Sequence, residues 1–193
     1  MRKLIVSNLI SLDGYASGPG GDVMALPFDA TFSDYNLELM QAADTLISGA
    51  VTYRGFVSYW PPIADDSNQP EVDRAISRRH SEIEHLVVSN TLTVGETGPW
   101  QENTRIVSRD EAPDAITHAK ESEGGTILVF GSVTTWNGLL AAGLVDELHM
   151  MVGAGVLIDG VPAFSVQPPG PMRLTGARQL GDSNIALLLY SLA

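Results

Sequence analysis

The feature that most constrains the fold is an alternation of short apolar runs with helical patterns along the middle of the chain. Four runs of four to six residues, rich in Leu, Ile and Val, are typical of buried strands: 45–49, 85–89, 105–108 and 125–130. Helical patterns occupy 28–43, 71–83, 112–122 and 133–142. Strands that alternate with helices need right-handed crossovers, which build a parallel sheet with helices on both faces.

The two ends of the chain extend this sheet in different ways. Residues 3–12 are mostly apolar or β-branched and lead into Asp13-Gly14, which predicts a first strand followed by a turn. Three strand-like segments with little helix between them, 145–152, 172–178 and 185–192, predict antiparallel pairing at the C-terminal edge. No linker or shift in composition divides the chain. We therefore predict one α/β domain over residues 1–193, with a mixed, mostly parallel sheet between two layers of helices.

The charge balance and the missing cysteines exclude several classes of protein. The 193 residues contain 11 Lys and Arg against 23 Asp and Glu, a net charge of −12, and no basic run that would follow nucleic acid. The absence of cysteine excludes disulfides, thiolate nucleophiles and thiolate-bound metals. No apolar run reaches about 18 residues, so we expect no membrane span. We expect a cytoplasmic protein with no nucleic-acid or membrane partner.

Several catalytic signatures are absent as well. The chain has no phosphate-binding loop of the G-x-x-x-x-G-K-[ST] type, no G-x-S-x-G elbow, and no G-x-G-x-x-G that opens a helix. His80 and His85 are five residues apart and are expected to point in different directions, while His118 and His149 stand alone. We therefore expect no metal site.

Small and hydroxyl-bearing residues gather where predicted strands end. Four such ends are residues 11–14, 48–52, 89–91 and 131–134. Ligands of an open α/β sheet bind outside the carboxyl ends of its strands, where backbone amides and helix N-termini approach a phosphate. Each end taken alone is better explained as a turn or a helix cap. Together, the four favour a site for an anionic, nucleotide-like ligand.

Four segments carry a resemblance to a known family. The segments S-L-D-G-Y at 11–15, G-A-V-T-Y at 49–53 and V-F-G-S at 129–132 resemble the first strand, the G-R-x-T turn and the cofactor turn of the dihydrofolate reductase superfamily. The segment L-L-A-A-G-L-V-D-E-L at 139–148 is similar, almost letter for letter, to a more specific motif. That motif belongs to the reductase domain of the riboflavin-pathway deaminase-reductase and its single-domain relatives. The resemblance extends from Lys3 to about Leu192.

The resemblance implies a three-layer dihydrofolate reductase-like fold, NADPH at the strand ends and hydride transfer to a heterocyclic small molecule. The best candidate substrate is 5-amino-6-(5-phosphoribosylamino)uracil of riboflavin biosynthesis. Two alternatives stay open: dihydrofolate reduction, and a nucleotide-binding module without turnover. The resemblance also implies a homodimer.

Family position assigns the cofactor-binding residues. The adenosine and phosphate half would lie against Gly49, Ala50, Val51, Thr52, Ser89 and Asn90. The pyrophosphate would lie against Gly131, Ser132, Val133 and Thr134, and Ile10 and Ser17 would border the nicotinamide. Ala50 stands where the family often has an arginine that binds the 2′-phosphate of NADPH, so NADH is also expected to be accepted. Arg54 is the candidate replacement for that arginine.

The proton donor has two candidates. Family position favours Asp34, although the helical repeat turns it away from the face made by Phe32, Tyr35 and Leu39. Asp13, at a strand end beside the expected cofactor, would be a better donor if partial burial raised its pKa, and is otherwise a turn residue.

The substrate pocket has two further candidates besides Asp13. Tyr59 and Trp60, followed by two prolines, resemble an aromatic loop of the family. They either line the substrate pocket or pack in the core.

Overall fold

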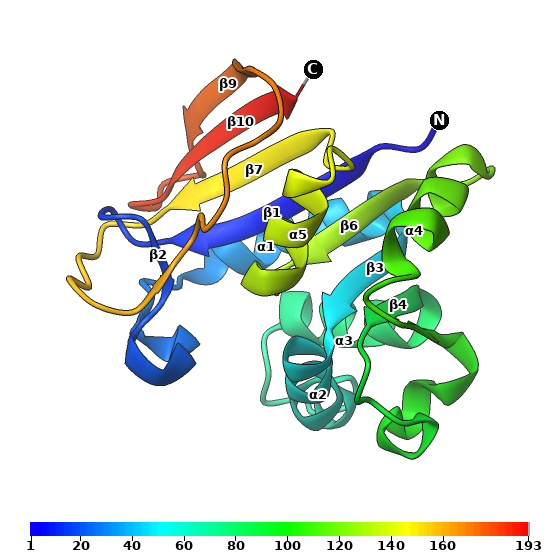
Figure 1. The fold of residues 1–193 in the computed structure, drawn as a ribbon. Helices are drawn as coiled ribbons and strands as arrows, with labels where there is room; N and C mark the ends of the chain where they lie inside the picture. Colours follow the sequence, from blue (N-terminus) through cyan, green and yellow to red (C-terminus); the bar gives the residue numbers. More distant parts are fainter. Residues whose placement is uncertain (193) are drawn as a thin grey trace.

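The computed structural model describes residues 1–192. Eight strands form one sheet in the order β5-β4-β3-β6-β1-β7-β10-β9 (Figure 1). The strands of this sheet are β1 Leu4–Ile10, β3 Ala43–Gly49, β4 Glu84–Val88, β5 Thr104–Val107, β6 Thr126–Phe130, β7 Glu147–Val152, β9 Met172–Gln179 and β10 Ala186–Leu192. The helices are α1 Ala30–Ala42, α2 Ala50–Tyr59, α3 Glu71–Glu82, α4 Ala112–Glu121 and α5 Val133–Ala141.

The pairing of the strands confirms the predicted fold class. Strands β5, β4, β3, β6, β1 and β7 are parallel, and Ser7 of β1 lies between Phe130 of β6 and His149 of β7. Strand β10 pairs antiparallel with both β7 and β9, so the C-terminal segment forms the antiparallel edge. The expectation of one domain over 1–193 stays a prediction.

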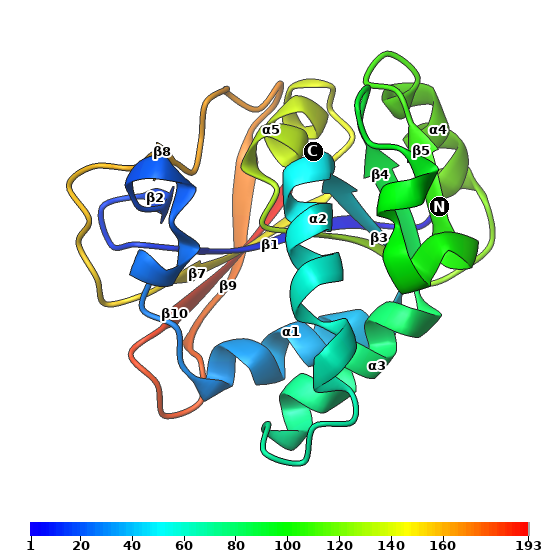
Figure 2. The same cartoon turned by 90° about the horizontal axis from the view of Figure 1, so that it is seen from below.

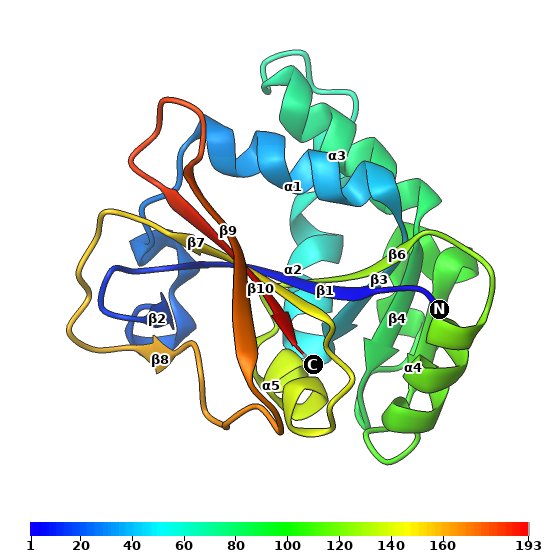
Figure 3. The same cartoon turned by 90° about the horizontal axis from the view of Figure 1, so that it is seen from above.

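Helices cover both faces of the sheet, because both faces of its central strands are apolar. In β1, Leu4 and Val6 pack with α4 and α5, whereas Ile5 and Leu9 pack with α1 and α3. Figure 3 shows the sheet nearly on edge, with α1 and α3 on one side and α4 and α5 on the other. The continuous apolar runs of the sequence reflect this burial on both faces.

Helix α2 was not predicted. Its first residues were interpreted only as a turn, but the chain continues as a helix from Ala50 to Tyr59. Tyr53 is fully buried against Val87, Leu92 and Trp100, in a small core of its own beside the sheet. Figure 2 shows α2 running from the neighbourhood of α5 toward α1 and α3. Helix α2 therefore connects the carboxyl end of β3 to the layer that contains α1 and α3.

The expectation that His80 and His85 point in different directions was wrong. Both side chains are buried, and their rings are parallel within 9° with centroids 5.4 Å apart. The indole of Trp100 stacks on both rings, at 5.1 Å from His80 and 4.8 Å from His85. We call these three residues the histidine stack. His80 lies in the last turn of α3 and His85 is the second residue of β4, so the turn between them brings the two rings onto the same tryptophan.

Smaller differences concern the ends of elements. Pro70 precedes α3 as its N-cap residue instead of opening the helix. Two short strands missed in the sequence, β2 Tyr15–Ser17 and β8 Val161–Pro162, form a separate two-stranded sheet. No helix within residues 1–192 combines the length and the hydropathy needed to cross a bilayer.

Candidate functional site

A cavity of about 550 Å³ opens at the carboxyl ends of β3, β4 and β6. Its position follows from the topology. From β3 the chain continues to β4 on one side, and from the adjacent β6 it continues to β7 on the other. Connections that leave neighbouring strands in opposite directions open a crevice between them, and this is where open α/β sheets bind ligands.

Two helix N-termini face this cavity. The first three residues of α2 (Ala50, Val51, Thr52) and of α5 (Val133, Thr134, Thr135) all line it. The backbone N–H groups of a helix's first turn have no partner inside the helix, and neither helix has a side-chain cap. Each N-terminus also carries the positive end of a helix dipole. The cavity therefore presents two sets of amide donors suited to negatively charged oxygens.

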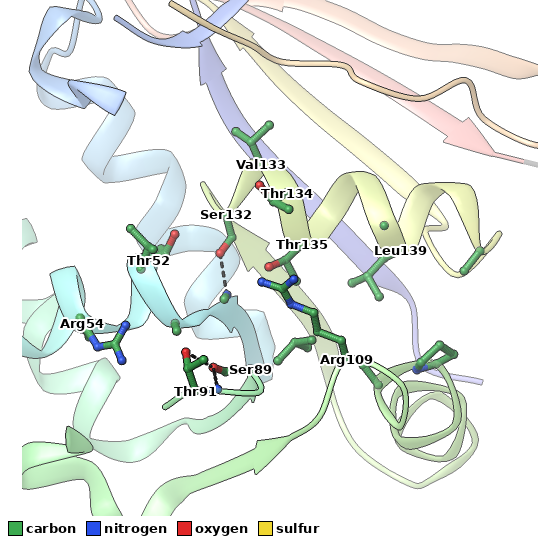
Figure 4. Close-up of a pocket in the computed structure, with 18 residues that line it drawn as sticks. Thr52, Arg54, Ser89, Thr91, Arg109, Ser132, Val133, Thr134, Thr135 and Leu139 are labelled. Carbon is green, nitrogen blue, oxygen red and sulfur yellow. Dashed lines mark hydrogen bonds between the residues drawn. The ribbon is translucent and has the colours of Figure 1, made fainter. Parts of the chain in front are cut away.

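One side chain links the two N-termini. The Ser132 hydroxyl accepts a hydrogen bond of 2.7 Å from the backbone N–H of Gly49, so the residue before α5 holds the residue before α2 (Figure 4). Gly49 has no room for a side chain, because a Cβ there would lie 2.6 Å from Oγ1 of Thr135. The absence of a side chain at position 49 is therefore what permits the two helices to meet this closely.

The charges around the cavity favour an anion. Within the described residues no Asp or Glu lines it, although the chain has 23 of them, and its two charged lining residues are Arg54 and Arg109. Nε of Arg54 donates to Glu96 at 2.8 Å, and this contact, together with hydrogen bonds from Thr93, lowers the pKa of Glu96 to about 2. Arg109 makes no ion pair within residues 1–192, and its guanidinium points into the cavity (Figure 4).

The remaining wall is apolar or carries hydroxyl groups. Val88, Ala112, Pro113, Leu139 and Ala142 contribute carbon atoms, a surface suited to the face of a flat ring. Hydroxyl groups come from six residues: Thr52, Ser89, Thr91, Ser132, Thr134 and Thr135. This combination of amides, arginines, hydroxyls and an apolar wall can hold a phosphorylated nucleoside.

The structure brings together most of the residues assigned to the cofactor. Eight of them line the cavity: Gly49, Ala50, Val51, Thr52, Ser89, Ser132, Val133 and Thr134. Gly131 and Asn90 are next to lining residues, and Oδ1 of Asn90 accepts the backbone N–H of Arg109 at 2.8 Å. Sequence reasoning missed Arg109 and Thr135. Arg109 follows a predicted strand end at 108, and that signal would have revealed it.

Two of the assigned cofactor residues lie elsewhere. Ile10 is buried in the core at the end of β1, and Ser17 is buried in β2. Neither lines the cavity, which ends at β6 on that side. Their assignment to the nicotinamide stays a prediction.

The expected rise in the pKa of Asp13 was wrong. Its side chain is exposed and accepts hydrogen bonds from the Ser11 hydroxyl at 2.6 Å and from the backbone N–H groups of Leu157 and Ile158 at 3.1 and 2.8 Å. These donors lower the pKa of Asp13, with the Ser11 hydroxyl the largest cause. A carboxylate held in its ionised form is a poor proton donor. In this structure Asp13 fixes the 157–158 turn, where Ile158 adopts φ of 66°.

The other predicted substrate and catalytic residues lie outside the cavity. Asp34 is exposed on α1, on the side away from the sheet, as the helical repeat indicated. Tyr59 is exposed at the last residue of α2, and about 7 Å of helix separates it from Arg54, the last residue of α2 that lines the cavity. Trp60 packs on the ring of His80 with a centroid distance of 5.4 Å. Among residues 1–192 there is no group of three or more His, Asp and Glu side chains that could hold a metal ion.

Comparison with known proteins gives a consistent family and fold. The chain matches the model of the RibD C-terminal domain family over residues 2–185. A putative riboflavin biosynthesis protein from Shewanella sp. PV-4 superposes with a TM-score of 0.68 at 22% identity, covering 98% of each chain. A pyrimidine reductase-like protein from Corynebacterium diphtheriae gives 0.68 at 16% identity, over 100% of this chain and 92% of that one.

A longer protein shares the fold over part of its length. The diaminohydroxyphosphoribosylaminopyrimidine deaminase/5-amino-6-(5-phosphoribosylamino)uracil reductase of Thermotoga maritima gives a TM-score of 0.69 at 12% identity. The match covers 100% of this chain but 57% of that protein. A search of curated protein sequences found no match.

Proposed function

The chain belongs to the RibD C-terminal domain family, and from this premise we propose that it is an NADPH-dependent reductase of a heterocyclic small molecule. The observation that carries the proposal is the pair of uncapped helix N-termini at the crevice between β3 and β6. Two adjacent sets of free amides fit the two phosphates of a dinucleotide, and the lining without carboxylates removes the main source of repulsion.

The residues present fit NADPH in three parts. Amides at 50–52 and 133–135 would hold the pyrophosphate, and the apolar wall of Val88, Pro113 and Leu139 would hold the adenine ring. Arg109 would bind the 2′-phosphate, in place of the family arginine that Ala50 replaces, because Arg54 is already paired with Glu96. When bound, NADPH supplies the hydride, and the protein supplies orientation and electrostatics.

We propose 5-amino-6-(5-phosphoribosylamino)uracil as the substrate. Two observations support this: the family match, and the fold shared with the Thermotoga maritima protein whose name includes that reductase activity. Dihydrofolate reduction and nucleotide binding without turnover are the alternatives. The purified protein should oxidise NADPH when the phosphorylated aminouracil is added. If it is a dihydrofolate reductase, NADPH is oxidised only with dihydrofolate. If it binds nucleotides without turnover, neither compound leads to NADPH oxidation.

We also propose that the enzyme is a cytoplasmic homodimer. Strand β9 is the edge of the sheet, and its Met172 and Leu174 are exposed, which leaves both unpaired backbone groups and apolar surface for a second copy. Sedimentation equilibrium should give twice the mass of the 20.6 kDa chain. A single-chain mass at micromolar concentration would contradict the dimer and leave the reductase proposal unaffected.

Turnover is tested by following NADPH absorbance with the aminouracil phosphoribosyl compound and with dihydrofolate in parallel. The Arg109→Ala variant should lose activity at low NADPH concentration, because it lacks the cation expected at the 2′-phosphate. Arg78→Ala, at an exposed arginine of α3 away from the cavity and from β9, is the matched control and should retain full activity. Absence of NADPH consumption with either compound would refute the proposed reaction.

A further inference from the structure

The proposed binding of NADPH determines where the substrate must lie. The adenine is assigned to the cavity wall near β4 and the pyrophosphate to the N-termini of α2 and α5, so the nicotinamide would extend the opposite way, past β6 toward β1 and β7. Residues 11–29 follow β1 and residues 153–171 follow β7. Figure 1 shows that β1 and β7 end beside the segment that carries β2. We call residues 11–29 and 153–171 the substrate end of the sheet.

The substrate end carries negative charges without positive ones. Its two segments contain no Lys, Arg or His. Their acidic residues are four exposed aspartates: Asp13, Asp22, Asp29 and Asp159. A phosphate group carries about two negative charges at neutral pH, so these carboxylates repel it.

Three arginines of neighbouring elements are engaged elsewhere. Nε of Arg54 on α2 donates to Glu96 at 2.8 Å. The guanidinium of Arg178 on β9 lies over the ring of Tyr35, 5.7 Å from its centroid. Arg109 lines the cavity that is assigned to the cofactor. A phosphate at the substrate end would therefore compete for cations that already have partners or a ligand of their own.

Backbone amides at the substrate end already have carboxylate partners. Asp29 caps α1 and accepts two amides of its first turn at 3.0 and 3.3 Å. Asp22 accepts the amide of Met24 at 2.9 Å, and Asp13 accepts the two amides of the 157–158 turn. The first turns of α2 and α5, in contrast, have no side-chain cap. First-turn amides that could hold a phosphate are thus free at the cavity and occupied at the substrate end.

The exposed surface of the substrate end is instead rich in apolar side chains. Five of them are more than half exposed: Leu12, Val23, Met24, Val156 and Ile158. An apolar surface with few polar groups suits the face of a flat heterocyclic ring. The chemistry of this end therefore fits the ring of a substrate better than an anionic group attached to it.

We propose that this protein recognises the heterocyclic ring of its substrate and not a phosphate group. It reduces the aminouracil without its phosphate at least as well as the phosphorylated compound. The proposal rests on the proposed function, because it takes the direction of the bound dinucleotide from it. The molecule then has one end that binds phosphates, through free amides and Arg109, and another at which aspartates occupy the amides.

The first test compares 5-amino-6-(5-phosphoribosylamino)uracil with the same compound after removal of its phosphate. NADPH oxidation at saturating NADPH gives kcat/KM for each compound. Removal of the phosphate should leave kcat/KM unchanged or raise it. One charge-assisted contact to a phosphate would contribute about 10- to 100-fold, so a fall in kcat/KM on removal would overturn the proposal.

A pair of charge reversals tests the location. Asp159→Lys places a cation at the substrate end, whereas Glu102→Lys makes the same change just before β5, at the amino ends of the strands; both residues are exposed. Two unit charges gained about 10 Å from a phosphate should raise the ratio of kcat/KM, phosphorylated to unphosphorylated, about threefold at about 0.1 M salt in Asp159→Lys. Glu102→Lys should keep the wild-type ratio. Equal ratios in the two variants would overturn the proposal.

A readout without turnover separates this proposal from the proposed function. Inorganic phosphate, compared with sodium chloride at the same ionic strength, should shift the amide NMR signals of residues 50–52 and 133–135. It should leave those of residues 11–29 and 153–163 unchanged, and a shift there would overturn the proposal whatever the protein reduces. NADPH oxidation with neither aminouracil would refute the proposed reaction, and the phosphate titration would still decide the present proposal.

Discussion

Acidification should destabilise this protein through the histidine stack. His85 is fully buried and its Nε2 lies 2.8 Å from the carbonyl oxygen of His80, to which it donates, while its Nδ1 has no hydrogen-bond partner within residues 1–192. Burial lowers the pKa of His85 from 6.5 to about 4. Burial, and then the neighbouring His85, lower the pKa of His80 in the same direction.

The sign of the effect follows from proton binding. Both histidines bind protons more readily in the unfolded chain, so stability is complete above about pH 6.5 and is lost as the pH falls toward 4. A difference of about 2.5 pKa units for His85 corresponds to about 3 kcal/mol over the whole window. Between pH 7 and pH 5 it amounts to about 2 kcal/mol, a large share of the stability of an ordinary domain.

Urea unfolding at pH 7 and pH 5 measures this loss. His85→Phe keeps an aromatic ring against Trp100 but cannot be protonated, so its free energy of unfolding should fall by about 2 kcal/mol less than that of wild type. Carboxylates with lowered pKa values, such as Glu71 and Glu96, titrate in both proteins and cancel in the comparison. His118→Phe, at an exposed position of α4, is the control. Equal losses in wild type and His85→Phe would refute the reasoning.

Two further predictions concern the residues around the cavity and the Asp13 contact. Arg109→Ala should reduce the preference for NADPH over NADH by about 10- to 100-fold, the contribution of one charge-assisted contact. Glu96→Gln should increase this preference, because Arg54 loses its partner. Parallel titrations with the two cofactors measure the affinity ratio of each variant, and ratios equal to that of wild type would contradict both predictions. Asp13→Asn should speed hydrogen exchange at the backbone amides of Leu157 and Ile158, which donate to Asp13. Because the pKa of Asp13 is lowered, the same change should appear in wild type only below pH 3.8. Unchanged exchange rates in the variant would contradict the assigned contact.

Local periodicity made most of the fold predictable. Strands such as β1 and β6 are apolar on both faces, and that pattern follows from burial between two helical layers. Helix α2 was missed because its first residues match a known turn and because it includes Gly55. Its buried Tyr53 and half-buried Phe56 pack on partners from β4 and α3 that come later in the chain.

The lining residues of the cavity were predictable where small residues follow a strand. Charges and pKa values that depend on contacts between distant segments were not. Gly49 and Ser132 lie directly at strand ends, so both were found. The pKa of Asp13 is lowered by the nearby Ser11 hydroxyl and also by two amides 144 and 145 residues away. The availability of Arg54 depends on Glu96 in a separate turn. No local pattern reports such contacts, because they form only when the whole chain has folded.

We propose that the crevice between β3 and β6 binds a phosphorylated dinucleotide. Thermal unfolding with NADPH and with NADH tests it most directly. NADPH at 100 times its dissociation constant should add about 2.7 kcal/mol of stability, a rise in Tm of roughly 5 to 11 °C for a chain of this size. NADH should do the same at higher concentrations. A Tm that neither dinucleotide changes at millimolar concentration would contradict dinucleotide binding at this crevice.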